Sequence, residues 1–348
     1  WGPATGVGWQ QGKTPPWPAH TGSITTTLSN GTVILLGGQR GDHGGGTFEA
    51  ANCTNQVYSF EMQEDKWIDH SEHVPWSKRW GHSAVTMPDD TVWMLFGCCE
   101  PDTPRVMFND VWRWNPVLGM PWRQVDTKHP FEGLEATSAA IRNDEIWIVG
   151  GWSTQRGTLS QVELLSTKSL QWTVKSKSHL VAWQTRANHA TAISPDKEWL
   201  FVFGGQHRAS GTGLWTRIGD AWRVRLSDYR TNGWEQISGL EPGRASPPSI
   251  YLPNGWLLTA AGHYVPEHDM ASADPEYVKR MHDDMHKKTL WLNDVWALDM
   301  NNGGRSGFQL VEKEAPWIGR DDQASCASGT SILIFGGGRK YGGGGYPD

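Results

Sequence analysis

The chain has 348 residues, of which 41 are glycine and 22 are tryptophan; glycine makes up about 12%, against about 7% in ordinary chains. Charged residues make up 20% and hydrophobic residues 37%, which excludes a disordered or collagen-like chain, and no apolar run reaches the ~18 residues of a membrane helix. The net charge of −6 argues against a nucleic-acid binder, so we expect neither nucleic-acid binding nor membrane insertion.

Short apolar runs that end in Gly-Gly, or a close match to it, recur along the chain. The first run, Val33-Ile34-Leu35-Leu36, leads into Gly37-Gly38. The six pairs in chain order are Gly37-Gly38, Gly97-Cys98, Gly150-Gly151, Gly204-Gly205, Ala261-Gly262 and Gly336-Gly337. Because these pairs are 53 to 75 residues apart, they indicate one structural unit each.

Two further elements follow five of the six pairs. The first is a short strand with Val or Ala at its third position: Asn55-Gln56-Val57-Tyr58, Asn109-Asp110-Val111-Trp112, Ser160-Gln161-Val162-Glu163, Gly219-Asp220-Ala221-Trp222 and Asn293-Asp294-Val295-Trp296. The second is an aromatic residue ten to thirteen positions later: Trp67, Trp122, Trp172, Trp234 and Phe308. Another short run precedes each pair across turn-forming residues such as Asn30-Gly31. Each unit therefore contains four short strands.

Four-stranded units at this spacing predict an all-β fold, a six-bladed β-propeller of four-stranded antiparallel blades in a single domain spanning 1–348. The predicted blades cover roughly 19–70, 79–125, 134–175, 184–237, 243–311, and 319–348 together with 1–12. After Gly337 no third element follows, so we expect the segment around Trp9 to form the outer strand and close the ring. The third strand of this blade is missing, comes from the segment around Trp1, or was lost with trimmed termini.

The combination of Gly-Gly after an apolar strand, Asn-Asp-Val-Trp and a later Trp resembles the kelch repeat, across nearly the whole chain. This resemblance implies a disc that binds a protein or glycan partner. The alternative is a kelch-type enzyme acting on a sugar or small molecule, since some kelch-like propellers are sugar oxidases, mutarotases or iron-dependent specifier proteins. No oxidase-type Tyr–Cys set can be assigned. Glu61, Asp65 and Asp69 approach the specifier run Glu-x-x-x-Asp-x-x-x-His, but Asp stands in place of His.

The largest departure from the repeat is an insertion in the fifth unit, at 263–292. It carries His282 and His286, which share one face if the segment is helical and could hold a metal. No third ligand is fixed by spacing, so we favour a solvated surface insertion and assign no metal or cofactor. The enzyme alternative, if metal-dependent, would depend on this insertion.

The linkers between units carry a second pattern, in which an Arg follows a Trp by three positions. Since the linkers return to the axis on one face, these residues predict a ligand-binding ring around a central funnel, suited to a carboxylate, an acidic peptide or a sugar. The predicted site residues are Arg79, Arg186, Arg244, Arg320, His20, Trp17, Trp76, Trp183 and Trp317. The alternative is that they are repeat residues that hold blades together; the third unit breaks the pattern with Leu134 and Glu135.

Four cysteines are present, and a bond between the adjacent Cys98 and Cys99 would be strained. Cys53 with Cys98 or Cys99 is a possible pairing. Two glycosylation sequons begin at Asn30 and Asn52, and with the absence of an initial Met they favour an extracellular or cell-surface protein over a cytoplasmic one. We therefore predict a secreted, non-enzymatic binding scaffold of unspecified oligomeric state.

Overall fold

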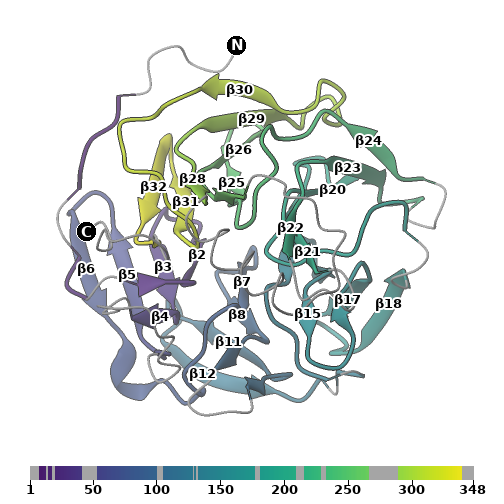
Figure 1. Ribbon diagram of the computed structural model, residues 1–348. Coiled ribbons are helices and arrows are strands. Elements are labelled where there is room, and N and C mark those ends of the chain that lie inside the picture. The colour runs from purple at the N-terminus through teal and green to yellow at the C-terminus, as the bar shows by residue number, and fades with distance from the viewer. Residues whose placement is uncertain are drawn as a thin grey trace, which may run out of the picture.

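The computed structural model describes residues 8–12, 15–17, 20–40, 53–99, 105–127, 129–130, 132–176, 181–208, 215–228, 233–265 and 289–338. They form an all-β propeller whose sheets surround a central axis (Figure 1). The helical content of these ranges is a single 3-10 turn, Ser71–His73. None of the described segments is a helix able to span a bilayer.

Five blades are four-stranded antiparallel sheets whose strands run in chain order from the axis outward. Blade 1 contains β2 (Ile24–Thr27), β3 (Val33–Leu36), β5 (Val57–Glu61) and β6 (Lys66–Asp69). Blade 2 contains β7 (Ser83–Thr86), β8 (Val92–Leu95), β11 (Val111–Asn115) and β12 (Met120–Val125). Blade 3 contains β13 (Ser138–Arg142), β14 (Glu145–Val149), β17 (Val162–Ser166) and β18 (Trp172–Ser176). Blade 4 contains β19 (Ala190–Ile193), β20 (Trp199–Phe203), β23 (Ala221–Arg225) and β24 (Glu235–Ile237). Blade 5 contains β25 (Ile250–Tyr251), β26 (Trp256–Ala260), β29 (Val295–Asp299) and β30 (Gln309–Glu312).

The sixth unit departs from the predicted six four-stranded blades. It is a two-stranded sheet in the part of the chain described, formed by β31 (Ala324–Ser328) and β32 (Ser331–Phe335). The sheet lies between blades 5 and 1 (Figure 1). Whereas all four residues of β3 are buried, the apolar side chains of β32 are half-exposed. The prediction of four strands per blade is thus confirmed for five units and not for the sixth.

All six units are joined by the same backbone hydrogen bond. The second residue of each Gly pair donates its N–H to the linker residue that begins the next unit, at 2.8–2.9 Å. The donor and acceptor residues are Gly38 and Arg79, Gly97 and Leu134, Gly151 and Arg186, Gly205 and Arg244, Gly262 and Arg320, and Gly337 and His20. The last of these bonds joins the end of the described chain to its beginning, so the ring is closed.

The Gly pair of blade 2 is shifted by one residue from its predicted position. The first residue of each pair has φ near +60°, and in blade 2 this residue is Phe96, with φ +64°. The second has φ between +83° and +106° and is always glycine, here Gly97. A non-glycine residue tolerates the first conformation at a small cost, but only glycine readily adopts the second. Cys98 therefore follows the pair rather than belonging to it.

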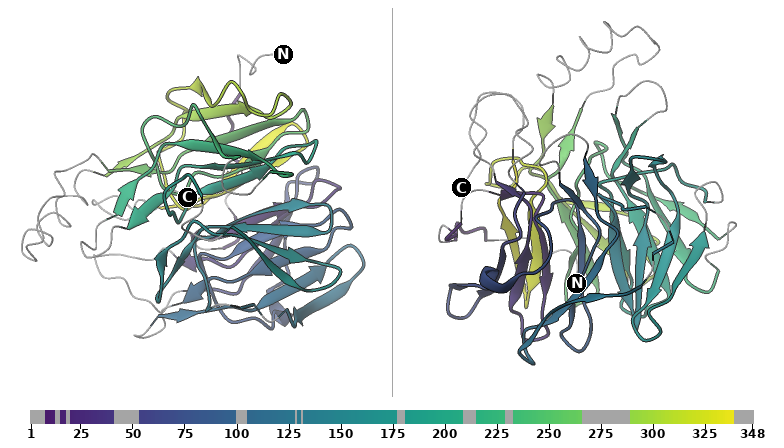
Figure 2. Two further views of the ribbon diagram at one scale, coloured as in Figure 1. Left: turned by 90° about the vertical axis from the view of Figure 1, so that its right-hand side faces the viewer. Right: turned by 90° about the horizontal axis from the view of Figure 1, so that it is seen from below.

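Short two-stranded hairpins follow the Gly pairs and lie on one face of the propeller, which we call the hairpin face (Figure 2). In blades 2 to 5 they pair β9 (Cys98–Cys99) with β10 (Val106–Met107), β15 (Trp152–Ser153) with β16 (Gly157–Thr158), β21 (Gln206–Arg208) with β22 (Trp215–Arg217), and β27 (His263–Tyr264) with β28 (Leu290–Trp291). In blade 1, β4 (Gln39–Arg40) pairs with β1 (His20–Thr21). Bridges between each hairpin and the adjacent linker place the linkers on the same face.

Candidate functional site

The predicted arginine ring is part of the interior of the blades. Arg79, Arg186 and Arg244 are fully buried, and Arg320 is 8% exposed. Each guanidinium donates through Nε to the carbonyl two residues earlier and through Nη1 to the carbonyl of the first residue of its own unit's Gly pair, such as Phe96. These contacts are the same in every unit, as expected of repeat residues. Direct ligand contact by these arginines stays a prediction, and their burial argues against it.

In three blades the arginine also forms an ion pair with the aspartate that begins the third strand. Arg79 bonds both oxygens of Asp110 at 2.6 and 2.8 Å, and Arg244 likewise bonds both oxygens of Asp294. Arg186 lies 2.8 Å from one oxygen of Asp220. Burial would raise the pKa of Asp110, but hydrogen bonds and charge from Arg79, together with the Trp112 indole N–H, hold it below its ordinary value. The Asp-x-Trp motif is therefore a device for binding the buried guanidinium.

Where the arginine is absent, the aspartate is absent too. Blade 1 has His20 with Gln56, and blade 3 has Leu134 with Gln161. The glutamine amide then donates to the side chain two residues on, to the Tyr58 hydroxyl at 2.8 Å in blade 1 and to Glu163 in blade 3. This paired substitution keeps a carboxylate from being buried without its cation.

The linker tryptophans pack against the outer-strand tryptophans of their own blades. Ring centroids are 4.2 Å apart for Trp17 and Trp67, 5.9 Å for Trp76 and Trp122, and 5.5 Å for Trp183 and Trp234. Trp317 makes the equivalent contact, 4.2 Å, with Trp9. These residues are buried or half-buried between elements, so the structure brings them together for packing rather than around an open funnel.

Two buried histidines line the inner edges of the blades. Burial, with a smaller contribution from the charges of Arg79 and Arg186, respectively, lowers the pKa of His82 and of His189 to about 3. A backbone hydrogen bond at Leu36 or Val149, the end of the preceding blade's second strand, opposes this shift. In the sixth unit Gln323 makes the corresponding bond to the Ala260 carbonyl. The histidines are therefore neutral structural contacts between blades at pH 7.

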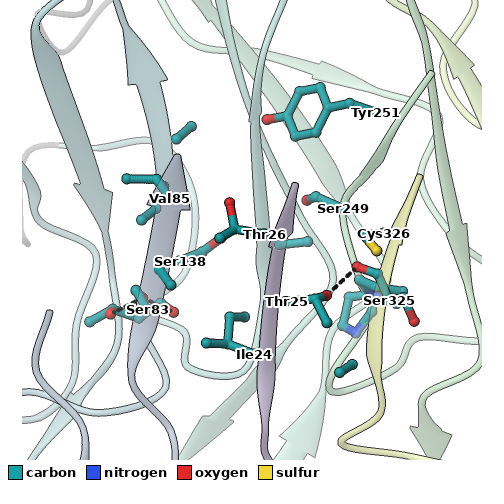
Figure 3. A pocket seen from close by; sticks show the side chains of 18 of the residues that line it. Ile24, Thr25, Thr26, Ser83, Val85, Ser138, Ser249, Tyr251, Ser325 and Cys326 are labelled. Carbon is teal, nitrogen blue, oxygen red and sulfur yellow. Dashed lines mark hydrogen bonds between the residues drawn. The ribbon is translucent and has the colours of Figure 1, made fainter. Parts of the chain in front are cut away.

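The central axis contains a cavity of about 540 Å³ lined by the six innermost strands. Hydroxyls and small apolar side chains dominate its wall, and Figure 3 shows Thr25, Ser83, Ser138 and Ser249 among them. Several of these hydroxyls join neighbouring strands: Thr25 donates to the Ser325 carbonyl at 3.0 Å, drawn as a dashed line in Figure 3. The volume is that of a small-ligand site.

The mouth of this cavity on the hairpin face is a ring of six equivalent turn residues with φ between +49° and +65°. They are Gly22, Gly81, Ala136, Asn188, Ser246 and Asp322, and all line the cavity. At these positions blades 1 to 3 have glycine or alanine, whereas blades 4 and 5 and the sixth unit have an amide, a hydroxyl and a carboxylate. Trp80 packs over Gly22, with a ring carbon 3.3 Å from where a Cβ would lie. The mouth is thus chemically asymmetric in an otherwise repeated structure.

Aromatic and arginine side chains gather on the hairpin face. The Arg105 guanidinium lies 5.1 Å from the Trp80 ring and 5.5 Å from the Trp152 ring, and bonds Glu135 at 2.7 Å. Arg208 lies 5.8 Å from the Trp215 ring. The linker pattern of Trp followed three positions later by Arg does not include these residues, because they stand one position after the Arg site or within the hairpins. Aligning the six units in register, rather than comparing the Arg positions alone, would have revealed them.

The disulfide joins Cys53 to Cys99, one of the two proposed pairings. It links the hairpin regions of blades 1 and 2, whereas Cys98 and Cys326 are buried cysteines outside it. The proposed metal ligands His282 and His286 lie outside the described residues. Within the described ranges no group of three or more His, Cys, Asp or Glu side chains could hold a metal ion.

The sequence of this chain also matches the model of a known protein family. A family model described as the KLHDC2/KLHL20/DRC7 Kelch-repeats domain matches residues 20–252. The chain belongs to the Kelch-repeat family. The matched range includes the first four kelch blades and the start of the fifth, with three of the four Arg sites. No curated protein sequence gives a significant match.

Proposed function

We propose that this kelch propeller is a non-enzymatic binding scaffold that presents its hairpin face to a protein partner. The observation that carries the proposal is the set of half-exposed tryptophans on that face, from four different blades. They are Trp80, Trp152, Trp215 and Trp291, accompanied by Arg105 and Arg208. Tryptophan and arginine are the residue types most enriched at binding hot spots, and exposed Leu290 extends this surface.

A glycan partner is the second candidate, because Trp80 stands beside a cavity lined by hydroxyls. An aromatic ring next to polar side chains offers a sugar both stacking and hydrogen bonds. The kelch-type enzyme alternative depends on the insertion at 263–292, most of which lies outside the described residues.

The proposal is tested by placing a photo-crosslinking amino acid at Trp152, on the hairpin face, and separately at Leu118. Leu118 is 69% exposed in the turn between β11 and β12, so it is a matched surface control. We expect a discrete crosslinked protein from position 152 that unlabelled propeller competes away, and none from position 118. A glycan array with the same protein runs beside it. Crosslinks only from position 118, or glycan binding without protein crosslinks, would overturn the protein-binding proposal.

We also propose that the segment around Trp9 completes the sixth kelch blade. Its support is the pairing of linker and outer-strand tryptophans, since Trp9 contacts Trp317 as Trp67 contacts Trp17. The Trp9 indole also donates to Glu312 of β30 at 2.9 Å. A double-mutant cycle on Trp9→Ala and Trp317→Ala tests it: strictly additive losses of stability would contradict a direct packing role.

An extracellular location is a third part of the proposal. The Cys53–Cys99 disulfide supports it, because such bonds persist in oxidising compartments. Exposed Asn30 in the turn between β2 and β3 is a sterically open sequon. Expression through a secretory pathway should add a glycosidase-sensitive mass that Asn30→Gln reduces; an unmodified secreted product would contradict glycosylation at this site.

A further inference from the structure

The second strand of each complete blade lies between two other strands, whereas β32 of the sixth unit is an edge strand. In blade 1, for example, β3 pairs with β2 on one side and with β5 on the other. In the described part of the chain, β32 pairs with β31 alone (Figure 1). Its last four residues, Ile332 to Phe335, are half-exposed, whereas the last four residues of the other second strands are buried. An edge strand with exposed apolar residues is a template for pairing with a further strand.

A backbone hydrogen bond that holds the third strand in blades 1 to 5 is not made in the sixth unit. In each of these blades the first residue of the Gly pair donates its N–H to the carbonyl of the residue just before the third strand, at 2.9–3.3 Å. The donors and acceptors are Gly37 and Gln56, Phe96 and Asp110, Gly150 and Gln161, Gly204 and Asp220, and Ala261 and Asp294. Within the described ranges the equivalent residue, Gly336, makes no such bond. The edge of β32 therefore offers a backbone donor at a known place.

The segments that adjoin the sixth unit in the sequence have the wrong composition for an inner strand. Residues 1–8 contain three glycines and one proline, and residues 339–348 contain four glycines and one proline. Glycine and proline are depleted in strands, and proline cannot donate to the ladder of an inner strand. Trp9 contacts Trp317 as Trp67 contacts Trp17, which is the contact of an outer-strand residue rather than of a third strand. These observations favour a third strand that another molecule supplies.

The five complete blades show which side chains the third-strand position accepts. Each third strand begins with valine or alanine, and this residue is at most 4% exposed. The five residues are Val57, Val111, Val162, Ala221 and Val295. The residue before each of them is glutamine or aspartate, and its carbonyl accepts the bond from the Gly pair. The position therefore fits an extended segment in which glutamine or aspartate is followed by a small or β-branched apolar residue.

We propose that the edge of β32 binds an extended segment of a partner protein, which pairs antiparallel with β32 as the third strand of the sixth blade. The Gly336 N–H donates to the carbonyl of the partner's aspartate or glutamine, and the next residue, valine or alanine, is buried beside the ladder. Backbone hydrogen bonds supply the affinity in this mode of recognition, and the buried side chain supplies the specificity. The site goes beyond the proposed function, because it is a strand edge and not part of the hairpin face.

The experiment adds to the intact protein a fluorescent peptide that copies residues 293–299, Asn-Asp-Val-Trp-Ala-Leu-Asp, and follows its anisotropy. We expect saturable binding at micromolar concentration. The same peptide with Val295→Lys should bind about tenfold more weakly or worse, because a buried charge replaces the valine. A peptide of the same composition in reversed order is the second control and should not bind.

Hydrogen exchange of glycine-labelled protein, measured by NMR, locates the bound peptide. The Gly336 N–H should exchange rapidly in the free protein and become protected when the peptide is present, because hydrogen-bonded amides exchange slowly. The Gly37 N–H is the matched control: it already donates to Gln56, so it should be protected with and without the peptide.

Three results would overturn the inference. They are absence of saturable binding, equal binding of the Val295→Lys peptide, and protection of the Gly336 N–H before any peptide is added, which would show that the chain itself fills the position. Failure here leaves the crosslink at position 152 unaffected, since that residue lies on the hairpin face. Loss of that crosslink would instead contradict the proposed function and leave the binding of the peptide to β32 standing.

Discussion

In blade 2 a buried guanidinium holds the start of the innermost strand, whereas in blade 3 a leucine occupies the same position. Arg79 bonds Asp110 and the Phe96 carbonyl; Leu134 makes no such bonds, and Gln161 stands where the aspartate would be. Blade 3 has its own polar network, in which Arg156 bonds Gln161 at 2.7 Å and Glu163 bonds His129 at 2.8 Å.

The comparison of blades 2 and 3 shows that polar groups that contact one another inside a blade are replaced together, as a set. The His129 ring packs on the outer-strand Trp172, with ring centroids 4.6 Å apart, and is held by Glu163. A single replacement would leave a buried charge or acceptor without a partner. The conserved position of the Arg sites within the repeat therefore reflects packing, and the residues that differ between equivalent positions are the better guide to binding.

The largest expected effect comes from breaking the blade-2 set. Arg79→Leu should lower the free energy of unfolding by about 3–5 kcal/mol, because it removes the donor to the Phe96 carbonyl and leaves the half-buried Asp110 carboxylate without its cation. Urea titration followed by fluorescence measures it. The double variant Arg79→Leu with Asp110→Gln reproduces blade 3 and should recover at least half of the loss. A double variant no more stable than the single one would contradict exchange as a set.

The next effect concerns the joint between blades 1 and 2, which carries a disulfide that the other described joints lack. Replacing Cys53 and Cys99 by serine should cost about 2–4 kcal/mol, since the bond closes a loop across 46 residues. Denaturation with and without reductant checks it. The reductant should destabilise the wild-type protein and leave the serine variant unchanged; equal sensitivity of both would be inconsistent with the assigned bond.

A smaller difference in stability is expected between substitutions at a glycine of a Gly pair and at a glycine of a hairpin. At Gly97 a Cβ would approach the Trp80 carbonyl oxygen and the His82 Cβ to 2.9 Å, whereas at Gly157 it would meet nothing within 4 Å. Both residues have positive φ. Gly97→Ala should therefore cost about 2–3 kcal/mol, from backbone strain plus crowding, and Gly157→Ala only about 1 kcal/mol. Thermal melts of the two variants compare them directly, and equal losses would mean that the crowding term is absent.

The smallest effect is a dependence of the free energy of unfolding on pH. His82 in blade 2 and His189 in blade 4 produce it, whereas the equivalent residue of the sixth unit, Gln323, does not titrate. His82 and His189 have pKa values lowered to about 3 in the folded protein, against about 6.5 when unfolded. Their stabilising contribution is therefore complete above pH 6.5 and lost as the pH falls toward 3. At pH 6 the loss should be about 1 kcal/mol for each histidine. His82→Gln, which copies Gln323, should flatten this part of the stability curve between pH 7 and 5; an unchanged slope would show that His82 does not titrate on unfolding.

Much of the fold follows from local sequence features. The Gly pairs, the Asp-x-Trp strands and the spacing of the later aromatics indicate four strands per unit, because periodicity and turn residues act over a few positions. The predicted position of the Gly pair in blade 2 is wrong by one residue, because Gly97-Cys98 resembles a Gly pair more closely than Phe96-Gly97 does. Only the backbone conformation distinguishes them: the residue that cannot carry a side chain is the second of the two.

The candidate binding site is harder to predict from the sequence than the fold. The periodic Trp and Arg residues occupy equivalent positions of the repeat, but whether a linker arginine faces solvent or an aspartate depends on a strand about 30 or more residues away. The mouth residues Asn188, Ser246 and Asp322 carry no local motif at all. They become a group only when six units are placed around one axis.

The spacing of glycine and tryptophan along the sequence determined a repeated β structure, because glycine at strand ends and aromatic residues at fixed spacing leave few alternatives to packed blades. The tertiary structure decided which of those residues are interior. Burial assigned Trp17, Trp76 and Trp183 to packing and the arginines to internal ion pairs, while closure of the ring brought the polar turns of blades 4 to 6 to one mouth. Contacts between units depend on the geometry of the whole ring, which no single repeat contains.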